Sequence, residues 1–123
     1  MYIESAGDEM IAAIHKRMRN LYGKHCLHIN STFLGGGVAE ILNSLIPLLN
    51  HAGLNTDWRT VHGTPHYYEI TKMIHNAMQG DPVSLTDEDR EVYQGVNEDF
   101  SIYTHIFHDF VVIHDPQPLP LVR

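Results

Sequence analysis

The sequence predicts a three-layer α/β fold built on a parallel sheet, and three observations support this. Signals for strands and helices alternate along the chain, which is typical of parallel sheets with helices on both faces. Three consecutive glycines, Gly35 to Gly37, separate an expected strand from an expected helix. Residues 110–113 form a continuous apolar run, the pattern of a strand covered on both faces. A chain of 123 residues suits one such domain.

The chain begins with an expected helix over 8–22, where apolar residues recur at helical spacing. Ser5 or Asp8 can cap its start. A short apolar run over 26–30 then predicts the first strand. An apolar stripe over 38–49 predicts the next helix, in which Pro47 is expected to cause a kink or an early end.

The second half continues the alternation. A strand is expected over 55–62, and a helix over 65–79 with Pro65 in its first turn. Thr86 begins a capped, acidic helix. That helix is expected to break near Gly95 and to resume over 98–105. The last strand is 110–113, after which Pro116, Pro118 and Pro120 are expected to prevent regular structure.

Composition narrows the function classes. The net charge of -7, from 15 acidic and 8 basic residues, argues against nucleic acid as a partner and against an anionic membrane surface. Residues 1–9 lack the apolar core of a signal peptide, and no apolar run has the length of a membrane span. The only cysteine, Cys26, is expected to be a buried thiol. We therefore expect a cytoplasmic protein.

The glycine loop is the first candidate site. A strand, Gly35-Gly36-Gly37 and a helix start can bring free backbone N–H groups close to a phosphate or a diphosphate. The pattern is not the dinucleotide fingerprint, because Glu40 stands where that motif has its third glycine. The alternative interpretation is a tight turn between strand and helix, without a ligand.

The second candidate site is the segment His114-Asp115-Pro-Gln117-Pro118, which follows the last strand. Ligands of open α/β sheets bind at the carboxyl ends of strands, so His114 and Asp115 are expected on the same rim as the glycine loop. A histidine at a strand end can equally be a hydrogen-bonded structural group.

Ten histidines raise the question of a metal site. His25 and His28 lie three apart on one strand, and therefore on opposite faces. Because a closed zinc site needs four convergent ligands and the chain has a single cysteine, we expect no structural metal.

Several segments together resemble a known family. They are His28-Ile-Asn-Ser-Thr, Gly35-Gly-Gly-Val-Ala-Glu40-Ile-Leu, Leu45-Ile-Pro-Leu-Leu49, Thr71-Lys-x-x-His75-Asn-Ala-x-Gln-Gly80 and His114-Asp-Pro-Gln-Pro118. From about Leu27 onward, the chain is similar to the opening of the retaining family-4 glycosyltransferases, in particular to the trehalose-forming synthases and the trehalose phosphorylases.

The resemblance implies a GT-B architecture, in which two Rossmann-like lobes face each other across a cleft. It implies a retaining hexosyltransferase that transfers glucose from a nucleoside-diphosphate glucose to an acceptor sugar, with no cofactor and no metal. Gly35, Gly36 and Gly37 would then line the cleft near the diphosphate and the acceptor. His114 would be the catalytic residue near the transferred sugar, Asp115 and Gln117 would bind substrate beside it, and Glu40 would support the loop.

The same resemblance implies an incomplete protein. We expect an N-terminal helix over 1–24 and a partial Rossmann-like N-terminal lobe over 25–123, with the C-terminal nucleotide-binding lobe absent. The chain would be inactive alone, whether it is a truncated protein, the product of a split gene or a fragment. A stand-alone sugar-binding or interaction module and a subunit completed in trans are the alternatives. An unpaired sheet edge predicts a homo-oligomer.

Overall fold

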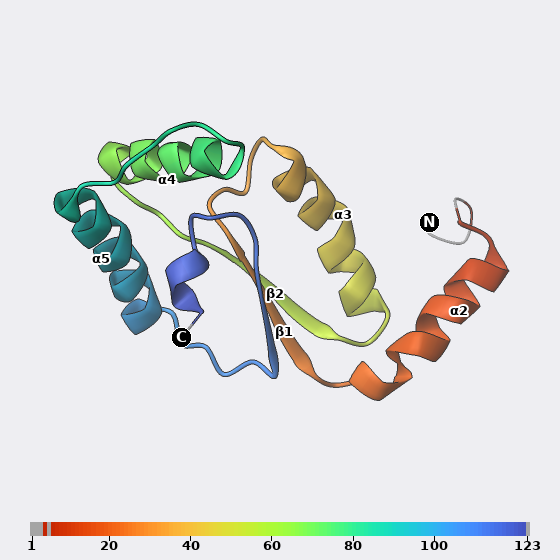
Figure 1. The fold of residues 1–123 in the computed structure, drawn as a ribbon. Coiled ribbons are helices and arrows are strands. Elements are labelled where there is room, and N and C mark those ends of the chain that lie inside the picture. The colour runs from red at the N-terminus through yellow and green to blue at the C-terminus, as the bar shows by residue number, and fades with distance from the viewer. Residues whose placement is uncertain (1–3, 5, 123) are drawn as a thin grey trace.

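The structure, a computed structural model, describes residue 4 and residues 6–122 and has the predicted α/β architecture. A three-stranded parallel sheet is formed by β1 (His25–Asn30), β2 (Asn55–Thr60) and β3 (Phe110–Ile113). Helix α3 (Gly37–His51) lies along one face, and α4 (Pro65–Met78) and α5 (Asp87–Tyr103) lie on the other side (Figure 1). The fold is therefore a partial Rossmann-like lobe, as the sequence predicts.

The strand order is β2-β1-β3, so the central strand is the first in the chain. Register places Cys26 opposite Thr56 on one side and opposite Phe110 on the other. The chain thus leaves β1 toward one side and returns as β3 on the other, which makes the carboxyl end of β1 a topological switch point. The loops after β1 and after β3 separate there, and this is where an open α/β sheet binds its ligands.

The two faces of β1 differ in chemistry. Leu27 and Ile29 are fully buried and form the core with Val61 and Tyr67, packed against α5. The alternate residues Cys26, His28 and Asn30 point to the α3 side and are also buried. The apolar face anchors the lobe, and the more polar face lies below the glycine loop.

Helix α5 corrects a sequence expectation. It runs without a break from Asp87 to Tyr103, although a break was expected near Gly95. A complete capping box between Thr86 and Asp89 starts it, and its residues Val92, Tyr93, Val96 and Phe100 pack against the core. Capping and burial therefore outweigh the roughly 1 kcal/mol that a glycine costs inside a helix.

Three other expectations about helices need partial correction. Pro47 lies inside α3, which continues to His51, so the expected early end is wrong and the kink stays a prediction. The proline-rich C-terminal segment contains one turn of 3-10 helix, η2 (Leu119–Leu121). The first helix is α2 (Asp8–Met18) followed by a 3-10 turn, η1 (Arg19–Leu21); Gly7 occupies its N-cap position, and Ser5 lies outside the described residues.

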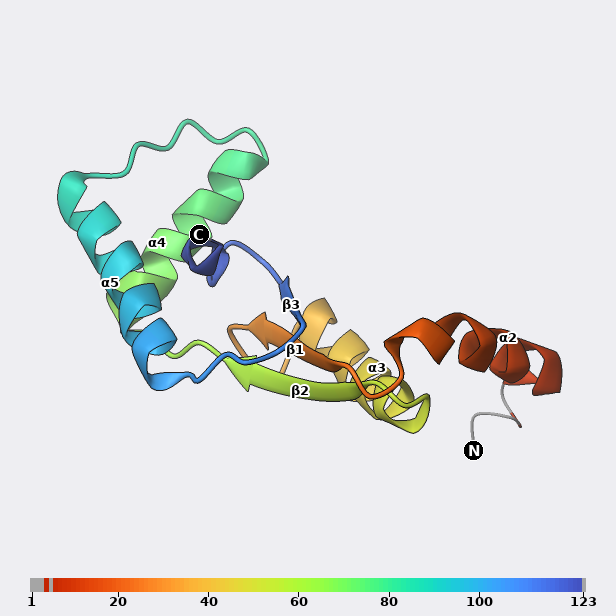
Figure 2. The same ribbon diagram turned by 90° about the horizontal axis from the view of Figure 1, so that it is seen from below.

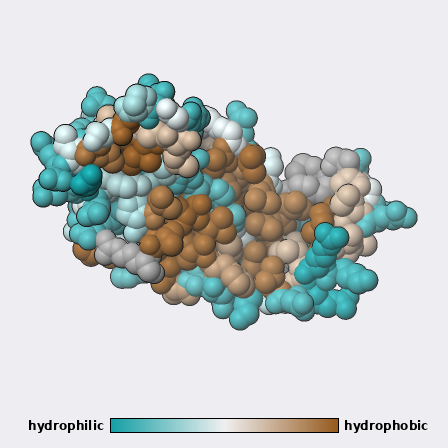
Figure 3. Space-filling model, in the orientation of Figure 1, coloured by the Kyte–Doolittle hydropathy of each residue, from teal (hydrophilic) through white to brown (hydrophobic). Residues whose placement is uncertain are grey.

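Two surfaces are less covered than the core. Helix α2 projects away from the sheet and buries no residue (Figure 2). Hydrophobic side chains form a band over η2, β3 and α3 in Figure 3. Phe110, Val111 and Val112 of the edge strand are 37–43% exposed. None of the helices in the described part of the chain is both long and apolar enough to span a membrane.

Candidate functional site

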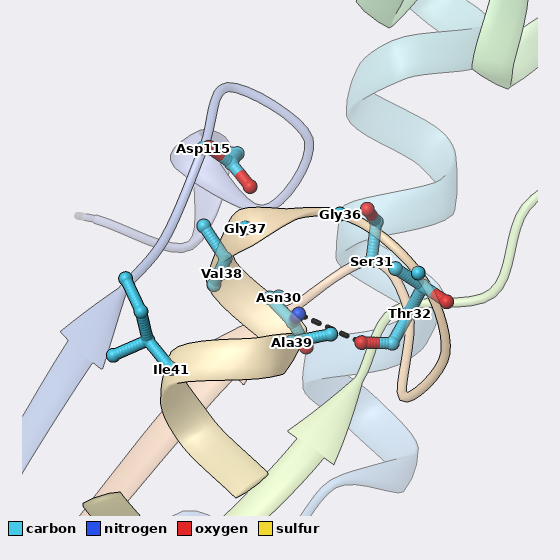
Figure 4. Close-up of a pocket in the computed structure, with 10 residues that line it drawn as sticks. Asn30, Ser31, Thr32, Gly36, Gly37, Val38, Ala39, Ile41 and Asp115 are labelled. Carbon is cyan, nitrogen blue, oxygen red and sulfur yellow. Dashed lines mark hydrogen bonds between the residues drawn. The ribbon is translucent and has the colours of Figure 1, made fainter. Parts of the chain in front are cut away.

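The carboxyl ends of β1 and β3 enclose a hollow of about 530 Å³. Figure 4 shows its walls: the loop after β1, the first turns of α3, and Asp115 on the loop after β3. The lining residues are Asn30, Ser31, Thr32, Gly35, Gly36, Gly37, Val38, Ala39, Ile41 and Asp115. The structure thus brings together four of the predicted site residues, namely the three glycines and Asp115.

The glycines contribute differently to this hollow. Gly35 and Gly36 have φ of 74° and 84°, in the left-handed region that favours glycine, whereas Gly37 is an ordinary first residue of α3. A Cβ built on any of the three meets no atom within 4 Å. Backbone conformation therefore requires the first two glycines, and all three leave open space where a ligand can approach.

The glycine loop, residues 31–36, is held by a short chain of hydrogen bonds. The Trp58 indole Nε1 donates to Asn30 Oδ1 at 2.8 Å, and Asn30 Nδ2 donates to the Thr32 carbonyl at 2.8 Å. The Thr32 hydroxyl in turn exchanges hydrogen bonds with the backbone of Leu34. Phe33 packs edge-on against Trp58. The loop is therefore tied to β2 through side chains, while its glycines stay exposed.

The N-terminus of α3 opens onto the hollow. Gly36 occupies the N-cap position and has no side chain that could cap the helix. The first intrahelical bond runs from the Glu40 N–H to the Gly36 carbonyl, and the preceding Gly37, Val38 and Ala39 all line the hollow. Uncapped N–H groups and the positive end of the helix dipole favour an anionic ligand there.

The loop after β3, residues 114–118, is anchored to the core. The buried Tyr67 hydroxyl donates to the Gln117 carbonyl at 2.7 Å, and Asn97 Nδ2 donates to the same oxygen at 3.0 Å. The Tyr93 hydroxyl donates to the Pro116 carbonyl. Burial raises the pKa values of Tyr67 and Tyr93, so both hydroxyls keep the protons that they donate.

Asp115 occupies a central position on this loop. Its φ of 64° is unusual for a residue other than glycine and indicates a backbone held in place by its surroundings. Asp115 also lines a second hollow of about 340 Å³, together with Gln117. The remaining wall of that hollow comes from α4 and consists of Tyr68, Thr71, Lys72 and His75.

The α4 residues of the second hollow were not predicted as site residues. The motif Thr71-Lys-x-x-His75 was noted only as part of a resemblance, yet its spacing of four places Thr71 and His75 on one face of a helix. This spacing could have indicated that the two residues contribute to one site. What the sequence could not provide was the position of α4 beside the loop after β3, to which Tyr67 is hydrogen-bonded through the Gln117 carbonyl.

His114 lies apart from the walls of these two hollows. Its Nε2 is 2.9 Å from Nδ1 of His28, which the predicted site did not include. Burial lowers the pKa of His28, and the neighbouring His114 lowers it further. Burial also lowers the pKa of His114, while the charge of Asp115 opposes that shift. Both imidazoles are therefore neutral near pH 7.

Two further expectations concern thiol and metal chemistry. Cys26 is buried, and burial raises the pKa of its thiol, so it has the inert character of a core residue. In the described part of the chain, no three His, Cys, Asp or Glu side chains converge in a way that could hold a metal ion.

Comparisons with known proteins give the family of this chain. The chain is 42% identical to the trehalose synthases of Thermococcus litoralis and Pyrococcus furiosus over an alignment of 127 positions, which covers 99% of this chain. It is 41% identical to the trehalose synthase of Rubrobacter xylanophilus over 118 residues, or 94% of this chain. These alignments cover only 28–30% of each relative, so the chain spans about 30% of the length of the curated relatives it matches.

The family comparison gives the same assignment. A family model described as "Trehalose synthase, N-terminal domain" matches residues 28–123, which include both loops of the hollow. The chain therefore belongs to the trehalose synthase family and corresponds to its N-terminal domain.

Proposed function

We propose that this chain is the N-terminal lobe of a retaining hexosyltransferase that transfers glucose from a nucleoside-diphosphate glucose to an acceptor sugar, forming trehalose. The observation that carries the proposal is the hollow at the switch point, where the uncapped start of α3 faces Asp115. In this assignment Gly35, Gly36 and Gly37 border the donor diphosphate. Asp115 accepts hydrogen bonds from sugar hydroxyls, Gln117 binds substrate beside it, and His114 contacts the transferred glucose.

The charges around the hollow support a role that needs a second lobe. Its lining includes the carboxylate of Asp115 but neither lysine nor arginine. A departing diphosphate carries negative charge that must be stabilised in the transition state. The start of α3 contributes a positive dipole, and Lys72 belongs to the second hollow. We propose that further cationic groups come from a C-terminal nucleotide-binding lobe, and that the chain alone is inactive.

The remaining assignments follow from the same proposal. Residues 1–24 form an N-terminal helical segment and residues 25–123 the partial lobe, consistent with an α2 that buries nothing against the sheet. The reaction requires no cofactor or metal ion in this scheme. The cytoplasm is the proposed compartment, which suits a chain whose one cysteine is a buried thiol.

We also propose that the isolated chain self-associates through β3. This edge strand exposes Phe110, Val111 and Val112, and an unpaired apolar edge pairs readily with another chain. A two-fold dimer would cover the same edge on both copies. Light scattering at tens of micromolar is expected to give more than the monomer mass of 14.0 kDa; a clean monomer contradicts this part of the proposal.

The test compares the chain alone with the chain joined to the C-terminal part of the Thermococcus litoralis relative. With UDP-glucose or ADP-glucose and glucose, the chain alone is expected to form no trehalose above a buffer blank, and the joined protein is expected to form it. Turnover by the chain alone refutes the need for a second lobe. A folded joined protein without turnover on either donor refutes the proposed reaction.

A further inference from the structure

The pair formed by His28 and His114 connects the buried sheet to the proposed site. The ring planes are 18° apart and the centroids are 5.2 Å apart, with 2.9 Å between the two facing nitrogens. The centroid separation exceeds the nitrogen separation by about two ring radii, so the rings meet edge to edge. A proton between the nitrogens then lies close to the line that joins them, which is the geometry of a strong hydrogen bond.

β1 holds His114 at two points. The His114 backbone N–H donates to the Ile29 carbonyl at 2.9 Å, which extends the pairing of β1 with β3 by one residue. The His114 ring meets His28, whose side chain is 5% exposed on the central strand. Directly after His114, the left-handed backbone of Asp115 turns the chain away toward the hollow. The ring position of His114 is therefore set from β1 and not by its own loop.

The chemistry of two neutral imidazoles restricts the pair further. Each ring carries one N–H, so one ring donates across the 2.9 Å contact and the other accepts. Nε2 of His114 is occupied in either arrangement. The tautomers of the two rings are consequently coupled: His114 carries its proton on Nδ1 when His28 donates, and on Nε2 when His28 accepts.

We propose that His28 is the positioning residue of His114: their shared hydrogen bond holds the His114 ring and leaves Nδ1 as its only ring nitrogen available to a substrate. This inference rests on the proposed role of His114 in sugar transfer. The competing explanation is that His28 merely fills space under α3. The two explanations predict different results for a side chain that fills the same space but places its hydrogen-bonding group elsewhere.

A matched pair of amides separates them. Asparagine places its amide close to where Nδ1 of histidine lies, whereas glutamine extends one methylene further. His28→Asn is therefore expected to keep the contact with His114, and His28→Gln is expected to lose it while keeping a polar amide in the same space. His28→Phe retains an aromatic ring without any hydrogen bond.

The direct readout is the ring ¹⁵N chemical shifts of His114 in the 123-residue chain at pH 7.5. In the wild type and in His28→Asn, the Nε2 shift is expected to be that of a hydrogen-bonded nitrogen. In His28→Gln and His28→Phe, the Nε2 shift is expected to move away from the wild-type value, because this hydrogen bond is lost. An unchanged Nε2 shift in His28→Gln overturns the inference, and so does the loss of the hydrogen-bonded shift in His28→Asn. If His28→Phe fails to fold, the asparagine and glutamine variants still decide.

The functional readout uses the joined protein described above. His28→Gln is expected to lower kcat by about tenfold or more with little change in KM for the donor, because a displaced catalytic group loses rate. His28→Asn is expected to restore most of the rate. If His114→Ala leaves kcat unchanged, the proposed role of His114 is wrong, and the ring spectra still establish whether His28 holds it.

Discussion

The two walls of the hollow are built in different ways. The loop after β3 rests on buried side chains of α4 and α5, with Tyr67 and Asn97 both bonded to the Gln117 carbonyl. The glycine loop is tied to β2 by polar side chains, and its glycines are exposed and free of neighbours. One wall thus shares the stability of the core, and the other wall can adapt to a ligand. A substitution in the core is expected to affect the first wall and to leave the second largely unaffected.

The largest expected effect is on the wall that rests on the core. Tyr67→Ala removes a fully buried ring and the bond to Gln117, and is expected to lower the free energy of unfolding by about 3–5 kcal/mol. Tyr67→Phe, which removes only the hydroxyl, is expected to lose about 1 kcal/mol. Urea denaturation measures both.

Tyr103 is the control for that experiment, because it belongs to α5 and is 83% exposed. Tyr103→Ala is expected to change the stability by no more than about 0.5 kcal/mol. Equal losses in Tyr67→Ala and Tyr103→Ala would mean that the core does not support the loop in the way described.

A substitution at Gly63 tests how tightly the Tyr67 ring is packed. A Cβ at Gly63 would lie 2.1 Å from Tyr67 Cδ1, and the buried ring has no room to move away. Gly63→Ala is expected to destabilise the protein by about 1–3 kcal/mol. Gly95→Ala is the matched control, since Gly95 lies inside α5 with open space around it, and it is expected to stabilise by about 0.5–1 kcal/mol. The same sign for both alanines would be inconsistent with this packing.

The pair of His28 and His114 predicts that the stability of the fold depends on pH. Burial lowers the native pKa of His28 and His114 below the ordinary value near 6.5, so the native state binds fewer protons than the unfolded state at mildly acidic pH. Stability is therefore complete above about pH 6.5 and falls as the pH drops below it, by at most about 1.4 kcal/mol per pH unit for each histidine.

Urea denaturation between pH 7.5 and pH 5 measures this slope. The double variant His28→Asn, His114→Asn is expected to flatten it. Asp89 and Asp109 do not interfere, because hydrogen bonds from Thr86 and His25 respectively lower their pKa values, and their contribution is lost only in more acidic solution. A double variant with the wild-type slope would show that the pair does not titrate in the expected direction.

The sequence predicted the fold well because parallel strands are buried on both faces and stand out as apolar runs between helices. It failed where long-range packing overrode a local preference, as at Gly95, whose helix is held together by Val92 and Val96 against the core. The proline segment likewise contains a short 3-10 helix whose Leu121 packs on that core.

Sequence reasoning predicted which residues share the hollow but missed the histidine pair, and both results have a physical reason. The rule that ligands bind at strand ends brought the glycines and Asp115 to one hollow, because it depends only on topology. The pairing of His28 with His114 joins residues 86 positions apart and depends on the register of β1 and β3. No local pattern in the sequence encodes that register.

The glycine loop allows a direct test of the proposed site, because the chain contains a matched glycine outside it. Gly36 and Gly80 have φ of 84° and 104°, and a Cβ at either position meets no atom within 4 Å. Alanine is expected to lower stability by about 1 kcal/mol at each position, through the same backbone strain. Of these two glycines, Gly36 lines the hollow and Gly80 does not.

The decisive measurement is the rate of trehalose formation by the joined protein carrying either alanine. Gly36→Ala is expected to lower kcat by about tenfold or more, because the added methyl group displaces the bound donor, and Gly80→Ala is expected to leave kcat unchanged. Equal rates in the two variants, at equal stability, would contradict the assignment of this hollow as the site of sugar transfer.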